Sequence, residues 1–243
     1  GLTAQSPEAL GNMGPPNALE RVVDDVATLA RHAAGEYPGL PLVVFGHSMG
    51  SLITQRLLMR HGALYRSVVL SGTMSIDMLL QARPQIDAAV AAAGRDVPAT
   101  ELQTAMFSAL MAGFEDPRTP FDWLSRDHAE VDRYIADPCC GFPLTLGSWQ
   151  DIAAVAALTS DAGELRKVPT TLRVLIASGA ADPVHLGGAG IEQLHARYAA
   201  AGISDLRWRL YPGGRHEMLN ETNRDEYTRD VIAWIEESLA ARR

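Results

Sequence analysis

The sequence predicts an α/β fold in which a doubly wound, mainly parallel sheet is interrupted by a helical insertion. Two observations support this fold class. Short apolar runs alternate with stretches of helical periodicity near both ends of the chain, which is the pattern of parallel strands connected by helices. Between these regions the alternation stops for roughly 90 residues, where the pattern is helical and interrupted by prolines. We therefore expect one core built from two separated parts of the chain.

Composition and charge restrict the class of protein. The chain has 243 residues, of which 47% are hydrophobic, so it is long and apolar enough to bury a sizeable core. Its formal net charge of −8 gives no electrostatic reason to expect a nucleic acid or an anionic membrane surface as partner. No apolar stretch approaches the ~18 residues of a membrane span, and the first residues lack the pattern of a signal peptide. We expect a soluble, cytoplasmic protein without a transmembrane segment.

The two cysteines of the chain, Cys139 and Cys140, are adjacent. This spacing suits neither a disulfide framework nor a common metal-ligand arrangement. We interpret them as a buried structural pair, and we expect the protein to need neither a metal nor a cofactor.

The first elements are a helix and a strand that lead to a glycine-rich turn. Residues 17–34 show helical periodicity, with Asn17 placed as N-cap and Glu20 three residues later. The continuous apolar run 40–45 then predicts a strand that is buried on both faces of a parallel sheet. After the turn, a second apolar helix leads to the next predicted strand at residues 67–71.

The insertion and the last elements complete the predicted fold. We expect the helices of the insertion to be broken at Pro84, Pro98, Pro117, Pro120, Pro138 and Pro143. The core then resumes with a strand at 172–178, a helix at 191–201 and a strand at 206–211. A closing helix over 225–241 is predicted to bury an apolar face made of Tyr227, Val231, Ile232, Trp234, Ile235 and Leu239. The chain thus divides into core residues 1–73, a helical cap at 74–167 and core residues 168–243.

The turn between the first strand and its helix reads Gly46-His47-Ser48-Met49-Gly50, a G-x-S-x-G pattern. In this position it predicts a nucleophile elbow, in which a strained turn presents the serine and glycines on both sides avoid clashes with the strand and the helix. We expect the His47 side chain to point away from that of Ser48. The helix that follows places the Met49 N–H where it can bind the oxyanion of a tetrahedral intermediate.

A serine hydroxyl is a weak nucleophile until a base takes its proton, so this turn requires a histidine and a carboxylate downstream. Asp182 follows the strand at 172–178, and His216 follows the strand at 206–211, so both are expected at the carboxyl edge of the sheet. His185 is too close to Asp182 in sequence to occupy a separate loop. Asp151 and Asp161 lack a preceding strand. The predicted triad is therefore the elbow serine with His216 as general base and Asp182 as its orienting partner.

Four segments carry a resemblance to a known family: GHSMGS, SGAADPV, YPGGRHEMLNE and FDWLSRDHAEVDRYIADP. They are similar to the monoacylglycerol lipase and lysophospholipase branch of the α/β-hydrolases, and the likeness covers nearly the whole chain. The resemblance implies hydrolysis of a lipid-like carboxylic ester, with Ser48, Asp182 and His216 aligned on the family's triad. Because the related serine aminopeptidases share much of this pattern, amide substrates stay open as an alternative.

The chain departs from the family before the elbow. Only 47 residues precede Ser48, whereas family members place several strands and a loop with the second oxyanion N–H ahead of it. We therefore expect a chain truncated at its N-terminus, with an exposed sheet edge at residues 40–45 that can pair with a second copy in a homo-oligomer. A binding subunit with an idle triad is a further alternative.

The insertion suggests the substrate. It contributes flexible apolar side chains that can line a pocket for an apolar acyl group: Met74, Met78, Leu79, Leu80, Met106, Phe107, Leu110, Met111 and Phe114. The alternative is that these residues only hold the helices of the insertion together. The expected partner is thus a small-molecule ester with an apolar acyl group.

Overall fold

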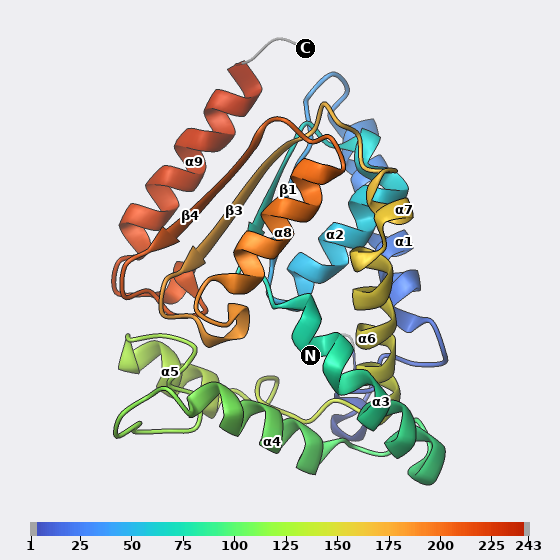
Figure 1. Cartoon of the computed structure of the whole chain (residues 1–243), viewed down its shortest axis with the longest axis vertical. Helices are drawn as coiled ribbons and strands as arrows, with labels where there is room; N and C mark the ends of the chain where they lie inside the picture. The colour runs from blue at the N-terminus through green and yellow to red at the C-terminus, as the bar shows by residue number, and fades with distance from the viewer. Residues whose placement is uncertain (1–3, 241–243) are drawn as a thin grey trace.

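The computed structural model describes residues 4–240. Its sheet has four parallel strands in the order β1-β2-β3-β4: β1 Val43–His47, β2 Ser67–Ser71, β3 Arg173–Gly179 and β4 Leu206–Tyr211. Each strand pairs with the next strand in the sequence, and every connection between them contains at least one helix (Figure 1). This arrangement confirms the predicted doubly wound, parallel α/β fold.

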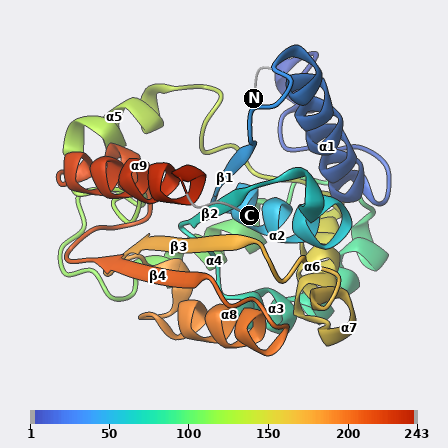
Figure 2. The same cartoon turned by 90° about the horizontal axis from the view of Figure 1, so that it is seen from above.

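Helices lie on both faces of the sheet and beyond the ends of its strands. The described residues form α1 Ala18–Glu36, α2 Met49–His61, α3 Ile76–Ala93, α4 Thr100–Met111, α5 His128–Ala136, α6 Leu146–Ser160, α7 Ala162–Leu165, α8 Ala189–Ala200 and α9 Arg224–Ala240. Short 3-10 turns lie at Pro7–Ala9, Gly62–Leu64, Pro183–His185 and Met218–Asn220. Viewed from above, α9 lies on one side of β3 and β4, and α8 lies on the other (Figure 2).

Alternation along the strands divides the core between these two layers. Val68 and Ile176 point into the larger cluster, which also contains residues of α1, α2, α3, α6 and α8. Val69 and Leu175, their neighbours in β2 and β3, point the other way, into a smaller cluster with α9. Successive strand side chains face opposite sides, so two buried strands supply apolar residues to both layers.

The first predicted strand behaves differently from the other strands. β1 begins at Val43 and, among residues 4–240, pairs with β2 alone, so it forms the predicted edge of the sheet. The prediction that it is buried on both faces is wrong, because Phe45 is 37% exposed. Its apolar run resembles that of a central strand, but burial depends on whether other parts of the fold cover it.

The start of α1 also differs from the prediction. Asn17 adopts a left-handed backbone (φ 66°), and its side chain caps nothing. The Asp151 carboxylate in α6 instead accepts hydrogen bonds from Asn17 N at 3.3 Å and Ala18 N at 2.7 Å. Glu20, the expected partner of the cap, binds Arg56 at 2.6 Å. A carboxylate from a distant helix thus replaces the predicted capping box.

Two expectations about helices also fail. α3 continues through Pro84, which lies on the exposed side of the helix, where its ring has space. The other five prolines lie outside the helices, as predicted. In α9, Ile232 is 50% exposed and Leu239 is 42% exposed, so the buried face is narrower than the sequence predicts.

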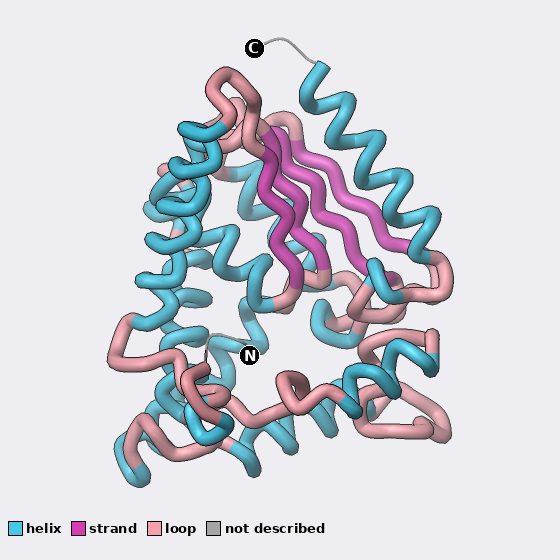
Figure 3. The backbone as a smooth tube through the Cα atoms, turned by 180° about the vertical axis from the view of Figure 1, so that it is seen from behind, coloured by secondary structure: helices cyan, strands magenta, loops and turns pink. Residues whose placement is uncertain are grey.

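The elements between β2 and β3 occupy two places. α6 packs against α1, α2 and α3, alongside the helices of the sheet layers. α4, α5 and their connecting loops lie beyond the carboxyl ends of the strands, as Figures 1 and 3 show from opposite sides. Of the helices formed by residues 4–240, none has the length and apolar character needed to cross a membrane. The carboxyl edge of the sheet therefore faces α4 and α5.

Candidate active site

The turn that the sequence predicts as a nucleophile elbow joins the end of β1 to the first turn of α2. Ser48 lies between them with φ 55° and ψ −123°, a strained conformation for a residue other than glycine. A Cβ atom on Gly46 would clash with Thr54 Oγ1 and lie 2.6 Å from Gly50 O, so this position requires glycine. At Gly50 an added Cβ would meet nothing within 4 Å. The predicted steric need for glycine is thus correct at Gly46 and wrong at Gly50.

Three side chains from the ends of three strands meet at this turn. His216 Nε2 lies 2.9 Å from Ser48 Oγ, and His216 Nδ1 lies 2.9 Å from Asp182 Oδ2. Asp182 and His216 are 1% and 2% exposed. Asp182 Oδ1 also accepts a hydrogen bond from Val184 N at 3.0 Å, which fixes the carboxylate. With the carboxylate accepting from Nδ1–H, Nε2 is free to accept the serine proton.

The His216 ring is close to two other rings. The centroids of the Trp123 and His47 rings lie 4.9 Å and 4.8 Å from the centroid of the imidazole. His47 Nδ1 lies 3.3 Å from Ser71 Oγ, which accepts a hydrogen bond from the Tyr227 hydroxyl at 2.8 Å. Burial, followed by the nearby His216, lowers the pKa of His47 to about 4. His47 is therefore neutral near pH 7, so the ring that it places beside His216 carries no charge.

Sequence reasoning missed this packing around His216. Gly72 makes it sterically feasible: its φ is +54°, and a Cβ there would lie 2.7 Å from His47 Cε1 and 3.1 Å from His216 Cε1. The sequence offers no periodic signal for the Trp123 contact, because Trp123 lies in the loop between α4 and α5. The expectation that His47 points away from Ser48 gave no indication that it lies against His216.

The competing residues have structural roles. His185 is fully buried, with Nε2 2.8 Å from Gly179 O and Nδ1 accepting from Gly188 N at 2.8 Å, so both ring nitrogens are used. Asp161 caps the short helix α7 by accepting from Glu164 N at 2.8 Å. Asp151 binds the start of α1, as described above. None of these three residues contacts Ser48 or His216 through a hydrogen bond.

A cavity of about 490 Å³ opens beside Ser48 and Met49. Five of the nine expected apolar residues line it: Met74, Met78, Met106, Phe107 and Leu110. Leu79 and Leu80 pack instead into the large core, and Met111 and Phe114 pack near Trp123. Cys139 and Cys140 also line the cavity and are partly exposed, so their interpretation as a buried pair is wrong. The cavity is mostly apolar, and Ser48 forms part of its lining.

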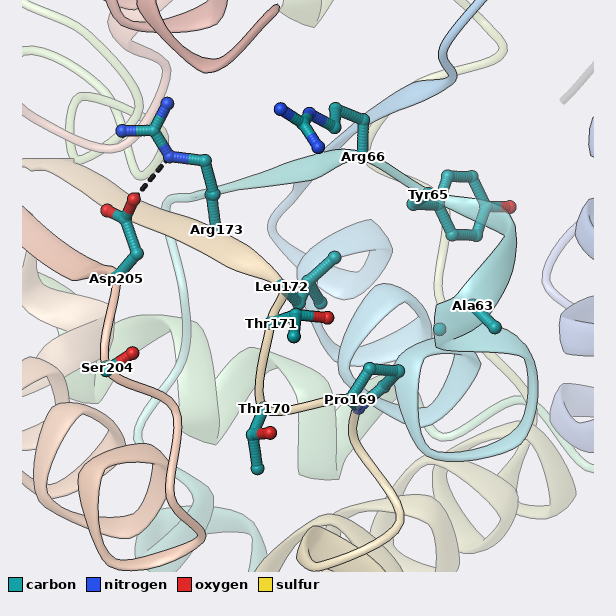
Figure 4. A pocket seen from close by; sticks show the side chains of 11 residues that line it. Ala63, Tyr65, Arg66, Pro169, Thr170, Thr171, Leu172, Arg173, Ser204 and Asp205 are labelled. Atoms are coloured by element: carbon teal, nitrogen blue, oxygen red, sulfur yellow. Dashed lines mark hydrogen bonds and ion pairs between the residues drawn. The ribbon is translucent and has the colours of Figure 1, made fainter. Parts of the chain in front are cut away.

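A second hollow, of about 480 Å³, lies at the opposite, amino end of the strands (Figure 4). Its charged side chains are Arg66, Arg173 and Asp205, and Arg173 is paired with Asp205. Its lining includes the hydroxyl groups of Ser204, Thr170 and Thr171 but no histidine, so these hydroxyls lack an imidazole base of the kind found beside Ser48. Within the described part of the chain, no cluster of three or more His, Cys, Asp or Glu residues is arranged to hold a metal ion.

Comparison with known proteins places this site in a family. The family described as serine aminopeptidase, S33 matches residues 4–223. A monoacylglycerol lipase of Mycolicibacterium smegmatis is 29% identical over 218 residues, which are 89% of this chain and 70% of that protein. The structure of a thermostable carboxyl esterase from Bacillus coagulans superposes with a TM-score of 0.81 and 26% identity, over 90% of this chain and 71% of the other.

A lipase in its open form gives a TM-score of 0.83 and 25% identity, over 95% of this chain and 76% of the other. The family match covers well over half of the residues, and the structural neighbours share the fold. The chain belongs to the serine aminopeptidase S33 family, in the monoacylglycerol lipase-like branch of the α/β-hydrolases.

Proposed function

We propose that the protein hydrolyses carboxylic esters through an acyl-enzyme intermediate on Ser48. His216 takes the Ser48 proton as the hydroxyl attacks the carbonyl and then gives it to the leaving alcohol, while Asp182 orients the imidazole and stabilises its charged form. A water molecule activated by His216 then releases the acid. The observation that carries this proposal is the continuous hydrogen-bonded chain from Ser48 to Asp182, with both links at 2.9 Å, beside an apolar cavity that Ser48 lines.

The oxyanion that forms during attack needs hydrogen-bond donors. Met49 is the first residue of α2, and the first N–H groups of a helix have no partner within the helix. We assign the Met49 N–H to the oxyanion hole. The positive end of the α2 dipole adds to this stabilisation.

The substrate is a lipid-like ester, such as a monoacylglycerol, a lysophospholipid or a short- to medium-chain acyl ester. The apolar lining supports an apolar acyl group, and methionines adapt to chains of different shape. The monoacylglycerol lipase relative supports the same class of substrate. No cofactor is needed, because the three side chains supply the nucleophile, the base and the charge stabilisation.

The family's description also raises an aminopeptidase as second candidate. Such an enzyme must bind the ammonium group of its substrate, and a carboxylate is the side chain suited to this task. The residues that line the cavity include neither Asp nor Glu. This lining favours an ester over a peptide with a free amino terminus.

The test is hydrolysis of p-nitrophenyl esters of increasing chain length and of a monoacylglycerol, beside aminoacyl p-nitroanilides. Wild type and Ser48→Ala are compared. We expect ester hydrolysis that falls by about 10⁶-fold in the variant. Rates that are equally negligible in both proteins would refute the esterase and favour a binding subunit, whereas faster cleavage of the anilides would favour the aminopeptidase.

A further inference from the structure

The loop that carries His216 is joined to a distant segment of the insertion. Residues 122–127, between α4 and α5, run beside the histidine loop, which we define as residues 213–223. His216 N donates to Trp123 O at 3.3 Å, and Glu217 N donates to Leu124 O at 2.8 Å. The candidate base is thus bonded through its own backbone to the segment that also carries Trp123, whose ring packs on the imidazole and lines the cavity.

A single buried carboxylate joins the same two segments. Glu221 is fully buried, and its Oε1 accepts hydrogen bonds from Arg126 N at 2.9 Å and from Arg215 N at 3.0 Å. Arg126 lies in the 122–127 segment, and Arg215 directly precedes His216. The other oxygen, Oε2, accepts from Arg126 Nε at 2.9 Å and from Thr222 N at 2.7 Å. Each oxygen of the carboxylate therefore accepts hydrogen bonds from the 122–127 segment and from the histidine loop.

Charge reinforces this connection. Burial alone would raise the pKa of Glu221, but the N–H groups of Arg126, Thr222 and Arg215 and the Arg126 charge outweigh it, so the pKa is lowered. Glu221 is therefore ionised near pH 7. The Arg215 guanidinium donates in return to backbone carbonyls of the 122–127 segment, at Asp122 and Ser125. The 122–127 segment thus binds the histidine loop through the Arg126 side chain, and the histidine loop binds the 122–127 segment through the Arg215 side chain.

We propose that Glu221 is a positioning residue that fastens the histidine loop to the 122–127 segment, so that His216 and the cavity wall at Trp123 move as one unit. This inference rests on the proposed function. An amide at this position keeps one acceptor oxygen, but its NH2 group faces the donors that the other oxygen now accepts from, so one pair of hydrogen bonds between the two segments is lost. The loop can then shift, and the 2.9 Å contact from His216 to Ser48 lengthens.

The chain offers a matched control at Asp151. This carboxylate is also buried, pairs with Arg95 at 3.1 Å and accepts two backbone N–H bonds, but it serves the start of α1. Glu221→Gln and Asp151→Asn each remove one buried charge, and both are expected to destabilise the fold. They differ in whether the lost carboxylate supports the histidine loop.

The experiment measures kcat and KM for a p-nitrophenyl ester, per active serine titrated with a fluorophosphonate, and the pH profile of kcat/KM. For Glu221→Gln we expect kcat to fall by about 10- to 100-fold. We also expect the acidic limb to move to lower pH, because Arg126 and Arg215 are left as uncompensated positive charges that oppose protonation of the imidazole. The other titratable groups beside His216, which are His47, Asp182 and Glu217, are unchanged in the Glu221 and Asp151 variants.

Two further variants keep the test decisive. Asp151→Asn should lose stability yet keep both kcat per active serine and the position of the acidic limb. Glu221→Asp retains the charge on a shorter side chain, so it should lower kcat without moving the limb, and it carries the test if Glu221→Gln does not fold. If the Glu221 variants keep the wild-type kcat and the wild-type position of the acidic limb, as Asp151→Asn does, while Ser48→Ala is inactive, the positioning role is overturned. A wild type as inactive as Ser48→Ala would instead refute the proposed function itself.

Discussion

Gly46 and Gly50 differ in whether the fold has space for a larger side chain, and this difference can be measured directly. In Gly46→Ala the new Cβ would lie 2.6 Å from Gly50 O, about 0.8 Å closer than the shortest ordinary contact of 3.4 Å, and would also clash with Thr54 Oγ1. The threonine hydroxyl can rotate away, but the carbonyl belongs to the backbone of α2. The turn must therefore open, which moves Ser48 relative to His216.

Overpacking of this kind costs about 1–3 kcal/mol of folding free energy. For a chain of this size that corresponds to a fall in Tm of roughly 2–12 °C. A displacement of about 1 Å at the nucleophile costs on the order of 10²-fold in kcat. Gly50→Ala is the control within the same pattern: its Cβ enters open space, and alanine favours a helix by up to about 1 kcal/mol over glycine, so Tm should hold or rise.

Differential scanning calorimetry and ester hydrolysis of the two purified variants provide the test. A Gly46→Ala protein as stable and active as Gly50→Ala would refute the argument that the contact between β1 and α2 requires glycine at position 46. Equal damage in both would show that the helix start, rather than this contact, sets the requirement.

Two further predictions concern the residues around His216. Asp182→Asn should keep the fold and lower kcat by about 10⁴-fold, because the amide no longer holds the imidazole in the required tautomer; a loss of under tenfold in ester hydrolysis would contradict the role assigned to Asp182. His47 has a folded pKa of about 4, below its unfolded value of 6.5, so stability is present above pH 6.5 and is lost as the pH falls towards 4. The loss amounts to about 3 kcal/mol. The free energy of unfolding, measured with urea, should therefore fall more steeply from pH 6.5 to pH 4 in wild type than in His47→Gln. Parallel curves would show that His47 has the same pKa in the folded and unfolded states.

Prediction from sequence succeeded where a local pattern was sufficient. β2 and β4 occupy the predicted residues 67–71 and 206–211, because turn residues delimit short runs that are rich in β-branched or large side chains. Prediction from sequence failed where a local structure depends on residues that are distant in the chain. The capping of α1 by Asp151, the continuation of α3 through Pro84 and the exposure of Phe45 all depend on what the rest of the fold places beside them.

The sequence by itself determined the fold class and the order of the three residues that meet at the carboxyl edge. It could do so because an elbow needs Gly46 two residues before Ser48 in one tight turn, and because parallel strands bring their following loops to the same edge. Only the tertiary structure decided what surrounds His216: the rings of His47 and Trp123 beside the imidazole, and the Glu221 carboxylate, which bonds the histidine loop to a segment 95 residues away. Contacts of this kind leave no periodic signal in the chain, because they depend on how separate elements pack rather than on the geometry of any one element.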